Sequence, residues 1–433
     1  MDYVRTVFDF LDAGVSPWHA AAEAVRRLEA GGYARLEEHA PWALEKGGRY
    51  YVARNGSAVI AFRLPEGDLA GWRVALSHSD SPTWRVKNAD VAQGDYVKLE
   101  TEGYGGMIMS SWLDRPLTVA GRAVVRTSGG VASRLIYIDR DLLVIPSVAI
   151  HYQRNANDGR KWDPQVDLQP LYGPAGCRSL EDLIVGEASV CPRSDVLSWD
   201  LDLAVRQKAV AIGPGGEYFM SPRIDDLECA ATTLQGFLDA APLADAAPVW
   251  GMLDNEEVGS SSRQGAQSTF LSDVLHRILL SMDLPSQAWW TCAANSLVLS
   301  ADNGHAVHPN APEKSDPQNA PRMNGGVVIK YNASQKYTTD ALSAALFQEI
   351  CRRAEIPTQR LANRADMPGG STLGNLQSHS FSAPMLDIGL AQLAMHSAVE
   401  TAGTKDIGHM VRAAGAFYAA PLRCLSDGRF DLA

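Results

Sequence analysis

The amino-acid sequence predicts an α/β fold in which one α/β domain is interrupted by an inserted β-rich domain. Helical and strand-like segments follow one another before residue 88. Short β-like segments without a long amphipathic helix then dominate residues 88–209, and helix–strand alternation returns after residue 210. We therefore expect one domain from residues 1–87 and 210–433, with residues 88–209 inserted into it.

The N-terminal part combines helical segments with strands. Apolar residues recur at helical spacing over residues 4–29, and the Ser16-Pro17 pair is typical of an N-cap followed by proline at the first helical position. Strand-like segments follow at residues 50–54, 58–63 and 73–77. Asn55-Gly56 separates the first two of them, which predicts a hairpin.

The later segments are predicted in the same way. Within the insertion, β-like segments are expected at residues 95–100, 117–126 and 132–138. After residue 210, helices are expected at 227–238, 269–280 and 339–354, and buried strands at 249–253 and 296–300. This order predicts that the first domain resumes after the insertion.

Composition excludes several classes of protein. Apolar residues make up 46% and charged residues 21% of the 433 residues, as in ordinary globular proteins. The net charge of −11 argues against binding to nucleic acid. Apolar runs such as 58–62 are far shorter than the roughly 18 residues that span a bilayer, and six cysteines without CxxC spacing suit reduced thiols. We expect a cytoplasmic protein without nucleic-acid or membrane partners.

Polar clusters follow several of the predicted strands or precede a predicted helix. His78 and Asp80 stand two residues apart at a strand end, so their side chains project to one face. They could form a metal-binding imidazole with an orienting carboxylate, or a simple hydrogen-bonded pair. Asp225 precedes a predicted helix, where an N-cap is the alternative to a metal ligand.

Further carboxylates and histidines extend this set. Asp254, Glu256 and Glu257 stand within four residues, and such charges repel one another unless water or cations neutralise them. Asp302 precedes a His-Ala-Val-His motif, while His396 stands alone among apolar residues, where a buried structural histidine is the alternative.

Taken together, these residues predict a dinuclear metal site. Two imidazoles and three carboxylates match the requirements of two divalent ions about 3.5–4 Å apart, one carboxylate bridging them. The candidate ligands are His78, Asp225, Glu257, Asp302 and His396. Glu256 remains as a general base, because adjacent side chains diverge. Residue chemistry alone leaves the assignment of the ligands open, but it predicts a hydrolase.

Ordered motifs identify a family resemblance. They include Ser-Pro-Trp-His at 16–19, His-Ser-Asp-Ser-Pro at 78–82, Tyr-Gly-Gly at 104–106, Asp-Asn-Glu-Glu-Val-Gly-Ser at 254–260 and His-Ala-Val-His-Pro-Asn at 305–310. With these motifs, the sequence resembles the aspartyl aminopeptidase family of metalloaminopeptidases over nearly its whole length. The resemblance implies a catalytic α/β/α domain with a central mixed sheet, interrupted by a β-rich dimerisation domain at residues 88–209.

The resemblance also implies roles for individual residues. The five candidate ligands would hold two divalent ions per subunit, with Asp225 bridging both; zinc is expected first, with cobalt and manganese as alternatives. Glu256 would activate the bridging water, and Asp80 would support the site. Contacts to the substrate or the oxyanion would come from His151, His305, Lys330 and Tyr337. The chains would assemble into tetrahedral dodecamers built from dimers, in which His151 would reach the neighbouring subunit's site.

Four positions depart from the family pattern: Asp226 replaces the usual asparagine, Asn303-Gly304 replaces a more apolar pair, and Gly369 replaces a frequent cysteine. All of them lie in or beside the expected pocket. The expected activity is removal of N-terminal residues, preferably Asp or Glu, from peptides. The alternatives are a related dinuclear aminopeptidase with broad or neutral specificity and a catalytically inactive scaffold assembly.

Overall fold

The computed structural model describes residues 2–189 and 192–432. Its helices are α1 (Tyr3–Ala13), α2 (Pro17–Ala30), α3 (Pro164–Asp167), α4 (Leu180–Glu187), α5 (Ile224–Asp239), α6 (Phe270–Ser281), α7 (Ala288–Ala294), α8 (Ala341–Arg353), α9 (Leu373–Gln377) and α10 (Thr404–Tyr418). Short 3-10 turns are η1 (Met109–Trp112), η2 (Arg193–Asp195), η3 (Glu256–Val258) and η4 (Pro312–Lys314).

The strands form four sheets. The bounds are β1 (Ala34–Arg35), β2 (Arg49–Arg54), β3 (Ala58–Arg63), β4 (Gly71–His78), β5 (Thr83–Gln93), β6 (Tyr96–Tyr104), β7 (Leu117–Thr127), β8 (Gly130–Tyr137), β9 (Leu171–Pro174), β10 (Val196–Val205) and β11 (Val210–Ile212). The remaining strands are β12 (Tyr218–Ser221), β13 (Ala246–Leu253), β14 (Leu297–Ala301), β15 (Gly304–His305), β16 (Val327–Tyr331), β17 (Thr358–Ala362), β18 (Met385–Gly389), β19 (Ala391–Leu393), β20 (Glu400–Gly403), β21 (Arg423–Ser426) and β22 (Arg429–Asp431).

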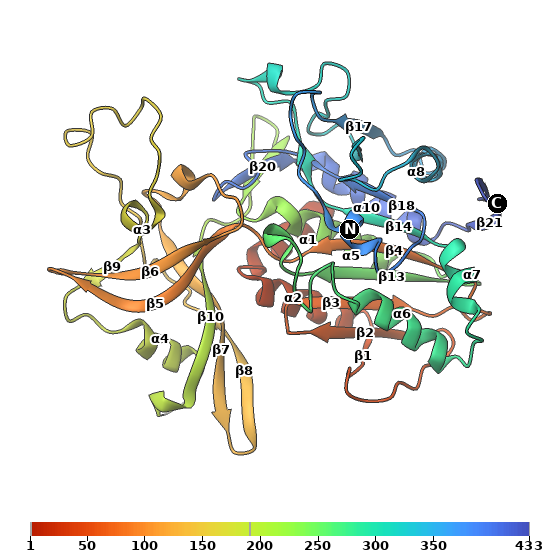
Figure 1. The fold of residues 1–433 in the computed structure, drawn as a ribbon, viewed down its shortest axis with the longest axis horizontal. Coiled ribbons are helices and arrows are strands. Elements are labelled where there is room, and N and C mark those ends of the chain that lie inside the picture. The colour runs from red at the N-terminus through yellow and green to blue at the C-terminus, as the bar shows by residue number, and fades with distance from the viewer. Residues whose placement is uncertain (1, 190–191, 433) are drawn as a thin grey trace.

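A nine-stranded mixed sheet forms the centre of the larger domain, in the order β1-β2-β3-β13-β4-β14-β18-β16-β17 (Figure 1). Its middle strands β13, β4, β14 and β18 run parallel. Every residue of β4, β13 and β14 is buried. Such continuous burial explains their apolar sequences, because helices cover both faces of the parallel part. The predicted α/β class is confirmed.

Helices pack on both faces of this sheet. One apolar core includes residues of α1, α2, α5, α8 and α10, and a second core includes residues of α6, α7 and α9. The two cores lie on opposite faces because side chains alternate along each strand: Ala75 of β4 belongs to the first core, and its neighbours Val74 and Leu76 belong to the second. The result is an α/β/α sandwich.

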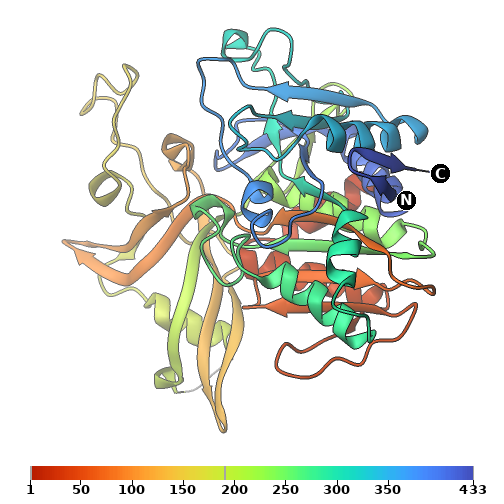
Figure 2. The same cartoon turned by 45° about the vertical axis from the view of Figure 1, so that its right-hand side comes forward.

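A separate six-stranded antiparallel sheet, in the order β8-β7-β10-β5-β6-β9, lies beside the larger domain (Figure 2). It has its own apolar core, to which Trp84, Leu99 and Leu201 contribute. Strand β5 crosses the domain boundary expected at residues 87 and 88, so the sheet begins at Thr83. The apolar run at 142–150 forms isolated bridges at Leu143, Val144 and Ile145 rather than a strand.

A small five-stranded sheet, in the order β11-β12-β20-β19-β15, was not anticipated from the sequence. Its strands are two to four residues long, too short to show a clear alternation of apolar and polar residues. The sheet nonetheless matters for the site, because β12 ends just before Asp225 and β19 ends just before His396.

Several further expectations can be compared with the structure. The expected helices at 227–238, 269–280 and 339–354 correspond to α5, α6 and α8, and Ser16 caps α2 as expected. The five described cysteines form no disulfide, while Cys191 lies outside the described residues. Within the described ranges, none of the helices has the length and apolar character needed to cross a bilayer.

Helices α5 and α10 approach each other closely through two glycines. A Cβ at Gly236 would lie 2.6 Å from the Cβ of Ala414 and 2.7 Å from the carbonyl oxygen of Val411. A Cβ at Gly415, on the facing helix, would lie 3.7 Å from the carbonyl oxygen of Gly236, which is an ordinary contact. Of these two glycines, only Gly236 therefore excludes a side chain.

We predict that Gly236→Ala lowers the free energy of unfolding by about 1–3 kcal/mol, because overpacking outweighs the better helix propensity of alanine. The matched variant Gly415→Ala should be neutral or stabilising by up to about 1 kcal/mol. Denaturant unfolding of both variants checks this. Equal effects of the two substitutions would contradict the packing argument.

Candidate active site

Three adjacent parallel strands carry candidate ligands at their carboxyl ends. Strand β4 ends at His78, β13 ends at Leu253 and leads into the turn with Glu256 and Glu257, and β14 ends directly before Asp302. The order β13-β4-β14 makes these ends neighbours at one edge of the sheet. In open α/β sheets this edge is where ligands bind, because the loops that follow parallel strands meet there.

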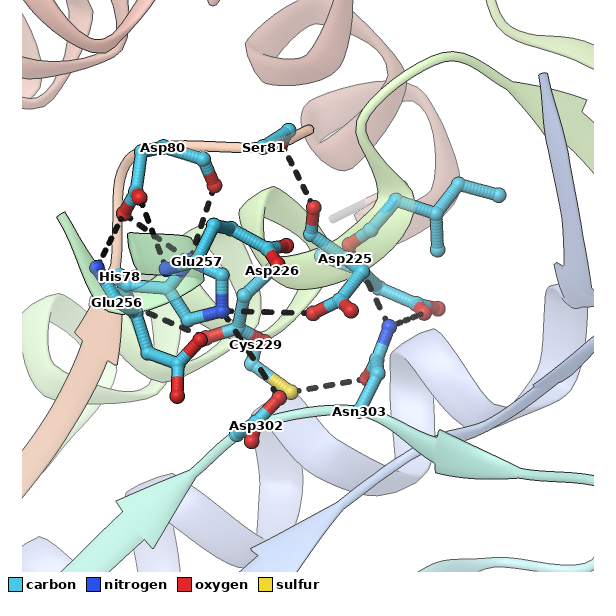
Figure 3. Close-up of polar contacts among 12 residues, drawn as sticks. His78, Asp80, Ser81, Asp225, Asp226, Cys229, Glu256, Glu257, Asp302 and Asn303 are labelled. Atoms are coloured by element: carbon cyan, nitrogen blue, oxygen red, sulfur yellow. Dashed lines mark hydrogen bonds and ion pairs between the residues drawn. The ribbon is translucent and has the colours of Figure 1, made fainter. Parts of the chain in front are cut away.

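Asp225 lies between two groups of candidate ligands (Figure 3 shows the first of them). Its Oδ1 is 3.4 Å from the Nε2 of His78, which is also 3.9 Å from an oxygen of Asp302. Its Oδ2 is 3.3 Å from the Nε2 of His396, which is 3.4 Å from an oxygen of Glu257. Each oxygen of this carboxylate thus faces a different imidazole.

Backbone carbonyls orient both imidazoles. The Nδ1 of His78 lies 2.9 Å from the carbonyl oxygen of Asp80, and the Nδ1 of His396 lies 2.6 Å from that of Gly106. A carbonyl only accepts hydrogen bonds, so each Nδ1 carries the proton and donates it. In the neutral imidazole each Nε2, which faces the carboxylates, then keeps its lone pair, and this is the tautomer that a metal ligand needs.

Two buried carboxylates hold the backbone of the candidate ligands. Asp80 accepts hydrogen bonds from the backbone N–H groups of Glu256 and Glu257, both at 3.1 Å. Glu400 accepts from the backbone N–H groups of Asp225 at 3.0 Å and His396 at 2.7 Å. The hydrogen bond from His396 also stabilises the left-handed backbone conformation of this residue, whose φ is 65°.

Burial and mutual charge perturb the titration of the site. Burial raises the pKa of Glu257 well above its ordinary value, and the charge of Asp225 adds to this effect. Burial and the neighbouring Asp302 raise the pKa of Glu256 to about 8, although His78 acts in the opposite direction. Burial alone would lower the pKa of His78, but the carboxylates of Asp225 and Asp302 raise it well above its ordinary value.

The site fits divalent cations. Within the described residues, the buried Oδ1 of Asp225 and Oε1 of Glu257 have no hydrogen-bond partner. Unpaired carboxylate oxygens are costly to bury unless a cation neutralises them. Ligand atoms within 4.8 Å of one another define three groups of candidate ligands. These are His78, Asp225, Asp226 and Asp302; His78, Glu256 and Glu257; and Asp225, Glu257 and His396. All five ligands expected from the sequence therefore converge.

The residues expected to contact the substrate occupy different environments. His305 lies beside a cavity of about 340 Å³ whose lining also includes His308, Lys314, Asp316 and Arg364. Desolvation there and the charge of Lys330 lower the pKa of His305. Tyr337 is 7% exposed, and its ring centroid lies 5.4 Å from the Nζ of Lys330.

Lys330 lies behind the candidate ligands rather than in that cavity. It is 1% exposed, and its Nζ donates to the carbonyl oxygen of Asn303 at 2.9 Å. The same Nζ lies 3.3 Å from Asp302 Oδ2, so the ammonium is paired within the protein. His151 lies in an exposed turn between β8 and α3, outside the cluster of candidate ligands.

Sequence reasoning missed several residues that shape the site. The carboxylate of Asp226 accepts from the backbone N–H of His78 at 3.1 Å, and Asn303 donates to Glu228 at 3.1 Å and Gln392 at 2.7 Å. The sequence signals were present, since both positions depart from the family pattern. Glu400 gave no such signal, because it is a single glutamate four residues beyond His396.

Imidazoles and carboxylates that converge at the strand ends of an α/β/α sandwich define a metal-dependent hydrolase. Comparison with known proteins makes this specific. The family described as aminopeptidase I zinc metalloprotease (M18) matches residues 10–418. The chain belongs to the M18 family and is a metalloaminopeptidase, which confirms the family resemblance.

Individual relatives cover nearly the whole chain. A probable M18 family aminopeptidase 2 of Clostridium acetobutylicum is 39% identical over 429 residues, which cover 96% of this chain and 99% of the relative. A solved complex of Ape4 and Nbr1 matches with 32% identity and a TM-score of 0.93, covering 96% of this chain and 85% of that one. The S. cerevisiae mApe1 dodecamer matches with 26% identity and a TM-score of 0.84, covering 96% of both chains.

Proposed function

We propose that this zinc aminopeptidase binds two divalent ions per subunit and removes N-terminal residues, preferably Asp or Glu, from peptides. The position of Asp225 carries the proposal of two ions. Each of its carboxylate oxygens faces a separate imidazole, at 3.4 Å for His78 and 3.3 Å for His396. His78, Asp302 and Asp225 would hold one ion, and Glu257, His396 and Asp225 would hold the other. Zinc suits this ligand set, as do cobalt and manganese.

Glu256 is the proposed general base. When bound, such a pair of ions supplies Lewis acidity and lowers the pKa of water. The carboxylate of Glu256 takes a proton from the water that adds to the scissile carbonyl, and it later gives this proton to the leaving amine. Burial and neighbouring carboxylates raise the pKa of Glu256 to about 8 in the metal-free chain, and bound cations would oppose this shift and favour the carboxylate that a base requires. Asp80 fixes the backbone N–H of Glu256 at 3.1 Å and thereby its direction.

The preference for acidic residues is supported by the cavity beside His305. Lys314 and Arg364 are basic lining residues of this cavity, and Asp316 is an acidic one. Arg364 is already paired with Asp366 at 2.7 Å, so Lys314 is the stronger candidate to meet a substrate carboxylate. Met395, the neighbour of His396, also lines the cavity, so the cavity lies beside the candidate ligands. A peptide held at those ligands would place a side chain in the cavity. A carboxylate on that side chain would gain a favourable electrostatic interaction with the basic groups.

We also propose assembly into tetrahedral dodecamers built from dimers, in the cytoplasm. A similar solved structure is an mApe1 dodecamer, which supports assembly of this chain. The six-stranded sheet offers the surface for the dimer, because exposed apolar side chains such as Val131, Leu135 and Leu197 lie on its strands.

We predict that Glu256→Gln lowers kcat by about 10²–10⁴-fold while both ions stay bound, because the amide keeps the shape but cannot accept the proton. Atomic spectrometry of the purified variant measures the metal content beside the turnover assay. Loss of an ion from Glu256→Gln would instead make Glu256 a ligand and reverse the roles of the two adjacent glutamates.

Two lysine variants separate substrate selectivity from support of the ligands. Lys314→Met should raise KM about fivefold for N-terminal Asp and Glu but not for neutral residues, since a partly exposed ion pair contributes about 1 kcal/mol. Lys330→Met should lower kcat at least about tenfold for both substrate classes, because Asp302 loses its buried partner. Aminoacyl-nitroanilides provide the assay. If Lys330→Met instead lost activity toward acidic substrates alone, Lys330 would be assigned to substrate binding.

His151 is expected to act in the neighbouring subunit's site. Glu256→Gln and His151→Ala chains, each nearly inactive alone, should regain partial activity when co-expressed in mixed assemblies, since a Glu256→Gln subunit can lend its His151 to a neighbour that keeps Glu256. Affinity tags that differ between the two chains identify the mixed assemblies. Verified mixed assemblies without added activity would refute action in trans.

A further inference from the structure

The segment that follows β6 leaves the six-stranded sheet and runs along the candidate active site. The hydroxyl of Tyr104, the last residue of β6, donates to Asp80 at 2.7 Å and accepts from the side chain of Asn255 at 2.8 Å. Tyr104 thus contacts the carboxylate that holds Glu256 and Glu257, and also the turn that carries them.

The next two residues contact the second group of ligands. Gly105 has φ 73°, and a Cβ there would lie 3.1 Å from the Cβ of Glu257 and 3.4 Å from the Cα of Pro82. The carbonyl oxygen of Gly106 accepts from the Nδ1 of His396 at 2.6 Å. A side chain at Gly105 would crowd Glu257 and strain the backbone, and the hydrogen bond to Gly106 sets the imidazole tautomer.

The contact continues along the backbone beyond the turn. The N–H of Ile108 donates to the carbonyl oxygen of His396 at 2.9 Å, and the hydroxyl of Ser111 accepts from the N–H of Ala398 at 2.8 Å. The 104–111 segment therefore follows the 396–398 segment over several residues. All candidate ligands belong to the larger domain, whereas β6 belongs to the six-stranded sheet.

We propose that Tyr104, Gly105 and Gly106 are positioning residues through which the β-rich domain controls occupancy of the ion site formed by Asp225, Glu257 and His396. This inference rests on the proposed dinuclear function. The carbonyl of Gly106 keeps the Nε2 of His396 directed at the ion, Gly105 allows Glu257 to approach, and Tyr104 anchors Asp80. Movement of this segment would weaken that site first, because the Asp80 oxygen that accepts from Tyr104, Oδ2, also accepts from the N–H of Glu257. His78 and Asp302 have separate support from Asp226 and Lys330.

Two variants and a matched control test the proposal in the full-length assembly. Gly105→Ala pushes the segment away from Glu257, and Tyr104→Phe removes one hydroxyl without changing the shape. Gly94→Ala is the control, because Gly94 also has a positive φ, 61°, in the same sheet but has no atoms within 4 Å of a Cβ. Metal-stripped protein is titrated with Co²⁺, and the visible absorption and a competing chelator give stoichiometry and affinity.

Wild type should bind two ions, and Gly94→Ala should bind each of them with the same affinity as wild type. In Gly105→Ala the second ion should bind about 10–100-fold more weakly while the first is retained, as is typical when the group that orients a ligand is lost. Tyr104→Phe should show the same selective loss, about tenfold, and it decides the question if Gly105→Ala does not fold.

Two outcomes would overturn the inference alone: unchanged affinities in both variants, or equal weakening of both ions, which would indicate a merely structural role. A wild-type chain that binds fewer than two ions would instead contradict the proposed function, so the two failures are distinguishable.

Discussion

The electrostatic cost of burying carboxylates together is the constraint on which this structure depends. Asp80, Asp225, Asp226 and Glu400 are each at most 3% exposed, and Asp302 is 8% exposed. Such a concentration of negative charge would destabilise a folded chain unless cations, donors or protons compensate it. The raised pKa values of Glu256 and Glu400, both about 8 and both caused first by burial, express this cost in the metal-free chain. The cations proposed for this site would relieve it, and metal binding would then be part of the stability of the fold.

The buried carboxylates fall into two groups, whose negative charge is compensated in different ways. Among the residues that the structure describes, one buried oxygen each of Asp225 and Glu257 has no hydrogen-bond partner, whereas Asp80 and Glu400 accept from backbone N–H groups. The first kind is therefore available to an ion and the second kind fixes where the ion will lie. Lys330 adds a permanent positive charge behind Asp302. This division keeps the ligand geometry in place even before an ion arrives, because the supporting bonds do not require one.

Much of the fold and most of the site could be predicted from the sequence. The candidate ligands stand in short motifs at the ends of apolar strands, and parallel strands bring such ends together. Glu400 and Gly106 could not be found in this way, since one is an isolated glutamate and the other acts through its carbonyl. The environment of Lys330 was also not predictable. This lysine stands in the otherwise apolar strand β16, and its partners come from segments that are distant in the sequence. Strand β5 is continuous across the expected domain boundary because its pairing, not its composition, defines the sheet.

The order of the ligands along the chain has a consequence for biosynthesis. His78 is made before the β-rich insertion, while His396 is made long after it. On the ribosome, carboxylates that are synthesised early, such as Asp80 and Asp225, are therefore exposed long before Glu400 and His396 can pack against Asp225. Domains fold largely in the order in which they are synthesised, so the β-rich domain is complete while the larger domain still lacks its last strands. Closure of the complete ligand set is then one of the last steps of folding, because it waits for the segment that carries His396 and Glu400.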